Sequence, residues 1–407
     1  MDFFEIEDKE NAEKEDKEYK FKPFHLTFKW IASFLMLGLL YPNPRTDKTR
    51  FMLIMALLFV TLPVIVVINI DIFVCWLKRD MFNIIRHSTI IGPVMGAFFK
   101  MFVLFHKRVQ AKLLIDEMTE DYESYNSLPP TYQEMAVRTI RTCKIYTLWW
   151  GLLITTTILM FPVLALGSTL YSHLFESIPR RYMLHDVNMP FMPTEARFES
   201  PYYESIFACM CVCAVISVLN YTSYDGLFCL ITNHACLKMS MYCLRLEDAF
   251  KQDDPDVMWS ELVTVIREQM KTFRFSALIQ NTFNTWLGTI LISTMIEIGS
   301  LLFHISAGYG FDVRYAVFSI TSVVHIFLPC LYAANLSAMS TDTATLVYCS
   351  GWERACPPRI RRLLPFVVAR AQSPIEINAF YMFRYDMMLF VNIMRTSYSM
   401  FTLLNTS

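Results

Sequence analysis

The chain alternates long apolar runs with shorter segments that are rich in charge. The hydrocarbon core of a bilayer is about 30 Å thick, so a helix needs about 20 mostly apolar residues to cross it. Seven runs reach this length, and the pattern therefore predicts an all-α membrane protein with seven transmembrane helices. The expected spans run from Phe51 to Leu77, Ile84 to Phe105, Tyr146 to Tyr171, Ser205 to Leu230, Phe275 to Phe303, Tyr315 to Leu336 and Ala379 to Leu404.

The spans and the segments between them divide the chain into four expected parts. Within the first part, the apolar stretch from Trp30 to Tyr41 is too short to cross a bilayer and is expected at the membrane interface. The parts are a cytoplasmic tail with this interfacial segment (1–50), six helices forming a ligand-binding bundle (51–336), a cytoplasmic helical anchor region (337–378) and the last helix (379–407).

Basic residues are concentrated in alternate loops. Residues 1–50, 106–145, 231–274 and 337–378 together hold 26 of the 36 Lys and Arg residues. Cytoplasmic loops of membrane proteins carry an excess of Lys and Arg. We therefore expect a cytoplasmic amino terminus and, after seven crossings, an extracellular carboxyl terminus, which is opposite to the arrangement of a G-protein-coupled receptor. The formal net charge of -1 says nothing about partners by itself, and no nucleic-acid partner is expected.

Composition and motif content argue against an enzyme. The 407 residues are 54% hydrophobic and 15% aromatic, with a mean hydropathy of +0.35, which is too apolar for a soluble globule. The aspartates near the spans, Asp71, Asp225 and Asp386, lie in no Gly-x-Gly-Asp motif of an intramembrane protease. The eight histidines do not recur at metal-ligand spacing on one helix face, so we expect no catalytic residues, no metal site and no cofactor.

Several ionisable residues interrupt the apolar runs. Asp225 and Glu297 are expected to be polar anchors that bond to neighbouring side chains, in preference to an ion. His87 and Lys100 fit an interfacial position equally well.

The outer halves of spans two to six carry residues suited to a binding chamber for a small hydrophobic molecule. Ligand pockets are mostly apolar, and Met and aromatic side chains accommodate ligands of varied shape. For each residue taken alone, packing between helices is the more common role. The outer loop from Ser172 to Glu204, rich in Pro and aromatics, is expected to fold over this chamber or simply cap the bundle. The candidate ligand-binding residues are Ile90, Ile91, Met160, Phe161, Leu164, Phe207, Met210, Ile298, Leu302, Phe318 and Ser322.

The last helix is unusually polar for a membrane span. It includes Arg384, Asp386, Asn392 and Arg395, and charges at membrane depth are normally kept where they face water or protein. We therefore expect this helix to line a polar space. One face at helical spacing, a candidate pore or gate, consists of Met394, Tyr398, Phe401 and Asn405, and ordinary helix packing is the alternative for it.

The carboxyl-terminal third resembles the insect odorant receptor family. The matching motifs are Tyr348-Cys349-Ser350-Gly351-Trp352, Arg370-Ala371-Gln372-Ser373-Pro374 and, in the last helix, Tyr398-Ser399-Met400-Phe401-Thr402-Leu403-Leu404. The chain lacks the Thr-Tyr…Gln-Phe ending of gustatory receptors and the long insertion of the odorant co-receptor between spans four and five. It is therefore most similar to a ligand-specific tuning subunit.

The resemblance implies a function. A family member would be an odorant receptor subunit of a ligand-gated, non-selective cation channel in the plasma membrane of a sensory dendrite. It would form a heterotetramer with the odorant co-receptor in contact with membrane lipid, bind a small volatile hydrophobic ligand, and line the pore with the seventh helix. Asn405 departs from the family, whose pore helices carry an apolar residue there. A metabotropic seven-helix receptor and a small-molecule transporter remain as alternatives.

Overall fold

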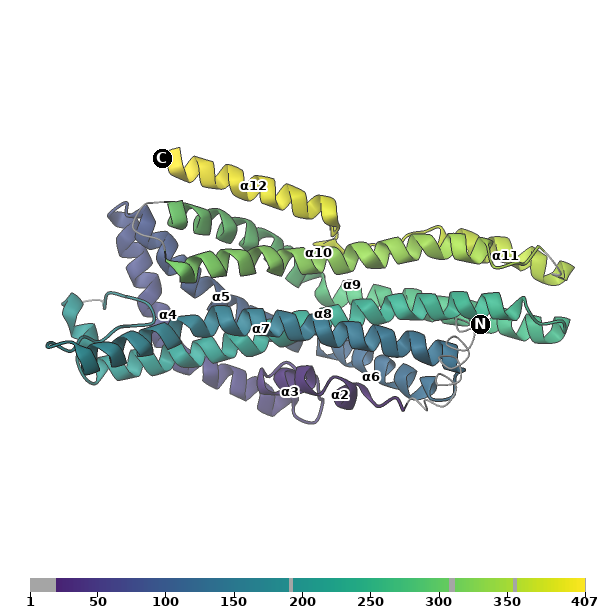
Figure 1. Cartoon of the computed structure of the whole chain (residues 1–407), viewed down its shortest axis with the longest axis horizontal. Coiled ribbons are helices and arrows are strands. Elements are labelled where there is room, and N and C mark those ends of the chain that lie inside the picture. Colours follow the sequence, from purple (N-terminus) through teal and green to yellow (C-terminus); the bar gives the residue numbers. More distant parts are fainter. Residues whose placement is uncertain (1–19, 190–192, 307–311, 354–356, 407) are drawn as a thin grey trace, which may run out of the picture.

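Long helices form one elongated bundle in the computed structural model, which describes residues 20–189, 193–306, 312–353 and 357–406 (Figure 1). Six helices of the described residues are long and apolar enough to cross a membrane. Each contains one of the first six expected spans, which confirms the predicted all-α membrane fold. They are α4 (Asp47–Leu77), α5 (Met81–His106), α7 (Pro130–Phe175), α8 (Tyr202–Ala249), α9 (Pro255–Ser306) and α10 (Val313–Tyr348).

Shorter elements complete the described fold. Helix α3 packs along α8, with Ile31 and Leu35 fully buried, so the short apolar segment near the amino terminus joins the bundle on one side. The expected tail lies mostly outside the described residues. The elements are α2 (Phe24–Thr27), α3 (Lys29–Leu37), α6 (Arg108–Tyr125), the 3-10 helix η1 (Thr194–Phe198), α11 (Pro358–Ala371), strands β1 (Asn378–Ala379) and β2 (Phe383–Arg384), and α12 (Met387–Thr406).

The last helix begins later than the sequence predicted. A helix from Ala379 is wrong, because β1 and β2 pair antiparallel there, and Phe380 and Tyr381 between them have positive φ angles. Side chains of α9 hold this connection. The Gln280 amide exchanges two hydrogen bonds with the backbone of Asn378, at 2.9 and 2.7 Å. Hydrogen bonds to α9 therefore hold this segment, where the sequence predicted the first turns of the helix.

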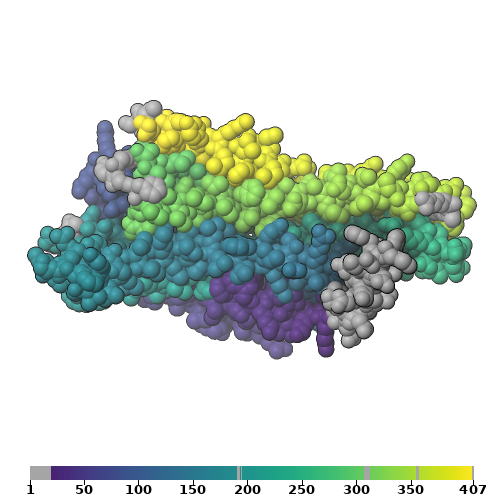
Figure 2. Space-filling model, viewed as in Figure 1, coloured from purple at the N-terminus to yellow at the C-terminus, as the bar shows by residue number. Residues whose placement is uncertain are grey.

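Two further contacts fix the start of α12. The Tyr385 hydroxyl, which is buried, donates a 2.7 Å hydrogen bond to the carbonyl of Leu287 on α9. Asp386 accepts a 2.8 Å hydrogen bond from the backbone N–H of Leu389 and so satisfies one of the free amides of the first turn. The helix then runs along α9 and α10 as a ridge on the surface of the bundle (Figure 2).

At the end of the bundle where α6 lies, a charged cluster joins α6 to α8. Asp121 of α6 accepts hydrogen bonds from His234, at 2.9 Å, and from Lys238, at 2.6 Å. Burial alone would raise the pKa of Asp121, but the hydrogen bond from His234 and the charge of Lys238 outweigh burial and lower it to about 2. Asp121 is therefore ionised at neutral pH, and this ion-paired contact fastens α6 to α8.

Gly288 lies where α9 meets the connection to α12, and a larger residue is expected to destabilise the fold. A Cβ atom at this position would overlap the ring of Phe380. Gly288→Val should lower the free energy of unfolding by about 1–3 kcal/mol, the usual effect of overpacking, and should reduce the Tm of the purified chain. Gly167→Val is the control, because nothing lies within 4 Å of a Cβ at that position. Equal Tm values for the two variants would contradict the expected clash.

Candidate ligand-binding site

An apolar cavity lies between α4, α5, α7, α8 and α10, near the end of the bundle that the long loop covers. It measures about 80 Å³, several times the roughly 10–15 Å³ that one water molecule requires. Its wall is almost wholly aliphatic and aromatic, as expected of a pocket for a small hydrophobic molecule. The wall consists of Val64, Ile65, Ile68, Thr89, Ile90, Ile91, Pro93, Val94, Thr157, Ile158, Phe161, Leu184, His185, Met210, Cys213, Ala214, Ser217 and Phe318.

The structure brings together part of the predicted set of ligand-binding residues. Ile90, Ile91, Phe161, Met210 and Phe318 line the cavity. They come from four different helices, and the bundle places their side chains around one space.

The other predicted residues lie elsewhere. Leu164 borders an outer hollow, Ser322 borders a smaller polar cavity, and Phe207 packs beside Met210. On α9, Ile298 is buried in the main core and Leu302 packs against the same core. Met160 is half-buried and lines neither the cavity nor the outer hollow. Leu164, Phe207 and Ser322 lie about one turn along their helices from residues that do line the cavity, and α9 does not border the cavity at all.

The long loop closes one side of the cavity. Leu184 and His185 line the cavity and also border the outer hollow, which measures about 1270 Å³ and carries several arginines, so the loop forms the partition between the two spaces. Met183, Leu184 and Val187 of this loop are buried. The loop therefore folds over the chamber.

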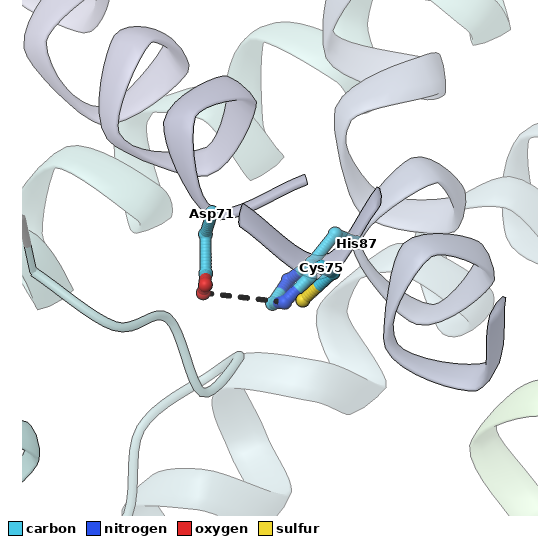
Figure 3. Close-up of side chains that lie close together, drawn as sticks. All are labelled: Asp71, Cys75 and His87. Carbon is cyan, nitrogen blue, oxygen red and sulfur yellow. Dashed lines mark ion pairs between the residues drawn. The ribbon is translucent and has the colours of Figure 1, made fainter. Parts of the chain in front are cut away.

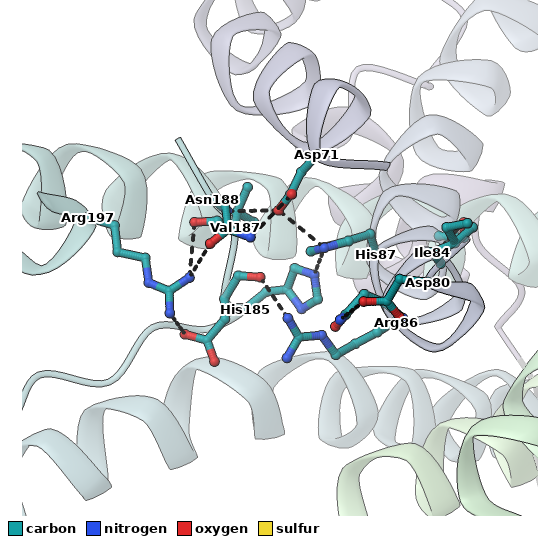
Figure 4. A network of polar contacts seen from close by, with 12 residues as sticks. Asp71, Asp80, Ile84, Arg86, His87, His185, Val187, Asn188 and Arg197 are labelled. Carbon is teal, nitrogen blue, oxygen red and sulfur yellow. Dashed lines mark hydrogen bonds and ion pairs between the residues drawn. The ribbon is translucent and has the colours of Figure 1, made fainter. Parts of the chain in front are cut away.

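Hydrogen bonds from α4 and α5 hold this loop in place (Figure 4). The Asn188 backbone N–H donates to Asp71 of α4 at 2.8 Å, and Arg86 of α5 donates to the Asp186 carbonyl at 3.2 Å. The ring nitrogens of His87 and His185 lie 2.7 Å apart. Burial lowers the pKa of His185 well below its usual range, so its ring is neutral.

Sequence reasoning missed this network. His87 is 1% exposed, so its side chain faces other parts of the protein. The expectation that no histidines come together considered spacing on a single helix, whereas His87 and His185 come from α5 and the loop. Only tertiary structure brings them into contact.

A buried polar layer lies deeper in the bundle than the cavity. Lys100 of α5 donates to Asp225 of α8 at 2.6 Å, and the His325 ring of α10 lies 3.1 Å from the second oxygen of this carboxylate. The Lys100 ammonium also lies 3.6 Å from the centre of the Tyr221 ring. Lys100 is 2% exposed, so its ammonium group is enclosed by the protein.

Glu297 of α9 extends this layer toward the cavity. It accepts a 2.6 Å hydrogen bond from the Ser322 hydroxyl of α10. A space of about 30 Å³ beside Glu297 is bordered by Thr157 and Phe318, which also line the apolar cavity. As the sequence predicted, Asp225 and Glu297 act as anchors between helices, although the partners are Lys100, His325 and Ser322.

Helix α12 divides into a packed face and an exposed face. Ile393 and Ser397 are buried, and a Cβ at Gly299 of α9 would lie 3.0 Å from the Ser397 carbonyl, so the two backbones approach closely. Asn392 and Arg395 lie on the exposed face.

The predicted pore face lies at the border of these two faces. Tyr398 is 60% exposed and Asn405 is exposed, whereas Met394 and Phe401 are half-buried. The Tyr398 and Phe401 rings are in contact, with centroids 5.8 Å apart. Part of the predicted face is therefore used in packing within this chain.

Fold and site define a polytopic helical membrane protein with a closed apolar cavity. A family model described as 7tm Odorant receptor matches residues 80–398. Odorant receptor 67c of Drosophila melanogaster is 21% identical over 337 residues, which cover 80% of this chain and 81% of the relative. The chain thus belongs to the 7tm odorant receptor family, and the family is one of receptors and not of enzymes.

Two solved structures share the fold. The olfactory receptor OR5 from Machilis hrabei superposes with a TM-score of 0.77 at 16% identity, covering 92% of this chain and 96% of that one. The same receptor in complex with eugenol gives a TM-score of 0.74 at 16% identity, covering 93% and 98%. The fold of this chain is therefore that of a solved insect olfactory receptor.

The Lys100–Asp225 pair is expected to be essential for stability. Lys100→Met leaves the Asp225 carboxylate buried with only His325, and breaking a buried pair in this way lowers stability by about 3–5 kcal/mol. The measurement is the Tm of the purified chain in detergent with lipid. Lys100→Met combined with Asp225→Leu should recover much of the loss, because no unpaired charge remains.

The matched control is Lys251→Met. Lys251 is 60% exposed and forms ion pairs with Glu247 and Asp248, and surface pairs of this kind contribute about 0–1 kcal/mol. A Tm for Lys100→Met equal to that of Lys251→Met would contradict a structural role for the buried pair.

Proposed function

We propose that this chain is the ligand-specific subunit of an odorant-gated, non-selective cation channel that assembles with the odorant co-receptor in the plasma membrane. The proposal rests on the exposed polar face of α12, together with the membership of the chain in the odorant receptor family. Asn392 and Arg395 project from this face. A polar face of this kind is unfavourable toward lipid but favourable toward a water-filled pore.

The ligand is a small, volatile, hydrophobic molecule held in the cavity above the polar layer. The aliphatic and aromatic wall supports this choice, as does the eugenol complex of the structurally similar OR5. Ile90, Ile91, Phe161, Met210 and Phe318 are the proposed contacts. A ligand that binds the open state more tightly than the closed state shifts the population toward opening.

Helix α10 offers a direct connection between cavity and pore helix. Phe318 of α10 lines the cavity, and Phe327, farther along α10, packs edge-on against Phe390 of α12 with ring centroids 5.3 Å apart. A displacement of α10 by the ligand would therefore be transmitted to α12. In the assembled tetramer, Met394, Tyr398, Phe401 and Asn405 would form the narrow part of the pore.

The segment 337–378 is the proposed anchor between subunits. Helix α11 packs on α9 through Arg359, which lies 3.8 Å from the Trp259 ring centre, and Arg370, which lies 3.9 Å from that of Phe273. Phe366, on the same side of the helix as these arginines, is 73% exposed. An exposed aromatic residue on a basic amphipathic helix is suited to contact with a neighbouring subunit on the cytoplasmic side.

Filling the cavity should abolish or weaken the odorant response. Ala214 lines the cavity from α8, and the added ring of Ala214→Phe would occupy the space of a ligand. In cells that also express the co-receptor, the odorant concentration for half-maximal current should rise at least tenfold, equal to about 1.4 kcal/mol. Ala208→Phe is the control, because Ala208 is exposed on the same helix.

These recordings also test the proposal as a whole. An absence of odorant-evoked current across a broad volatile panel, while another receptor responds with the same co-receptor, would contradict it. A current that required intracellular GTP would favour a metabotropic receptor, and substrate accumulation without the co-receptor would favour a transporter.

Thiol accessibility should distinguish the pore face of α12 from its packed face. Tyr398→Cys presents a thiol at a position that is 60% exposed, whereas Ser397→Cys places one at a position that is 0% exposed. A charged, membrane-impermeant methanethiosulfonate reagent should alter the odorant-evoked current of the first variant and leave the second and the unsubstituted chain unchanged. A Tyr398→Cys current insensitive to the reagent would place this residue against lipid or protein.

A further inference from the structure

Three side chains with metal-binding atoms meet beneath the long loop. Asp71 and Cys75 lie one turn apart on α4, and His87 reaches them from α5 (Figure 3). All three are buried, with exposures of 3%, 7% and 1%, and one ligand atom of each lies within 4.8 Å of those of the others. We propose that Asp71, Cys75 and His87 form a binding site for a zinc-like divalent cation.

The geometry is close to that of a tetrahedral site. Zinc binds carboxylate oxygen and imidazole nitrogen at about 2.0–2.2 Å and thiolate sulfur at about 2.3 Å, which places neighbouring ligand atoms about 3.3–3.8 Å apart. The Asp71 carboxylate and His87 Nε2 are already 3.2 Å apart. The remaining separations need to contract by about 1 Å at most. Three protein ligands would leave a fourth position for water.

Surrounding hydrogen bonds orient two of the three ligands. A metal-binding histidine normally forms a hydrogen bond through its other ring nitrogen, which fixes its tautomer. His87 Nδ1 lies 2.7 Å from His185 Nε2, and this bond leaves His87 Nε2 directed at Asp71 and Cys75. Asn188 donates to the two Asp71 oxygens, at 2.8 Å from its backbone N–H and 3.3 Å from its side chain. Ligands held in this way are already positioned for a metal.

The charges and the donor types select the ion. Binding displaces the thiol proton of Cys75 to solvent, and the resulting thiolate and the Asp71 carboxylate together balance a charge of +2, so the buried site becomes neutral. Thiolate and imidazole ligands favour zinc over calcium and magnesium, which prefer oxygen ligands. The outer hollow, which borders His185 and Asp186, lies beside the site. Because Asn188 and His185 belong to the loop over the cavity, a bound ion would also fasten that loop.

Metal content of the full-length chain tests the proposal. The chain, purified in lipid nanodiscs, is equilibrated with Zn²⁺ or Cd²⁺, desalted, and measured by elemental mass spectrometry and ultraviolet absorption. One ion per chain is expected, together with the charge-transfer band of a cadmium–thiolate bond. Excess Ca²⁺ or Mg²⁺ should not displace the ion.

Substitutions assign the ion to this site. Cys75→Ser should remove the cadmium band and weaken metal binding at least tenfold. Cys211→Ser, a half-buried cysteine of α8 outside this group, should change neither. Asn188→Ala keeps all three ligands and should weaken binding by about 10–100-fold, the usual effect of losing an orienting partner. The Asn188→Ala variant therefore tests the site even if Cys75→Ser does not fold.

Two results would overturn the proposal. The first is an unsubstituted chain that retains no ion after desalting. The second is a folded Cys75→Ser or Asn188→Ala chain that binds the ion as tightly as the unsubstituted one. Neither result bears on odorant-evoked current, so the metal site and the channel function can fail independently.

Discussion

The hydrocarbon interior of a membrane contains no water, so every polar group placed there needs a partner within the protein or a water-filled passage. Much of this structure follows from that constraint. Lys100 of α5 donates a hydrogen bond to Asp225 of α8, His325 of α10 lies 3.1 Å from the same carboxylate, and Ser322 of α10 donates to Glu297 of α9. These contacts join the helices that surround the cavity and fix their rotation about their own axes.

The same constraint separates the chain into a binding part and a gating part. Apolar residues fill the region between the polar layer and the long loop, where α4 and α5 meet the loop. The cavity is the space that these residues leave. Helix α12 lies outside this region, against α9 and α10 (Figure 1). Its Asn392 and Arg395 are exposed. Helix α10 touches both, through Phe318 at the cavity and Phe327 at α12, so a ligand can act on α12 without approaching it.

Local sequence patterns predicted the features that depend on length and apolarity alone. Six spans were located correctly because about 20 apolar residues in a row allow few other structures. The start of α12 could not be predicted, since it depends on Gln280 and Tyr385, which bond across about a hundred residues of sequence. Thirteen of the 18 residues of the cavity wall were also missed. The predicted set included Ile298 of α9, but α9 does not border the cavity and Ile298 is buried in the main core. Which helices surround the cavity depends on how the helices pack together, and the pattern of a single helix does not contain that information.

The loop that covers the cavity is held by polar contacts, and the hydrophobic pattern of the sequence does not predict these contacts. A loop that covers an apolar chamber must satisfy its own backbone groups, because a buried unpaired amide or carbonyl costs about 1–3 kcal/mol. Asp71 of α4 accepts a hydrogen bond from the Asn188 amide, Arg86 of α5 donates to the Asp186 carbonyl, and Arg197 of η1 donates to the Val187 carbonyl. Two helices and a later part of the same loop therefore hold three consecutive loop residues. Buried Leu184 can then face the cavity while water is kept on the other side of the loop. The affinity of the chamber for an apolar ligand therefore depends on charged residues that the ligand does not touch.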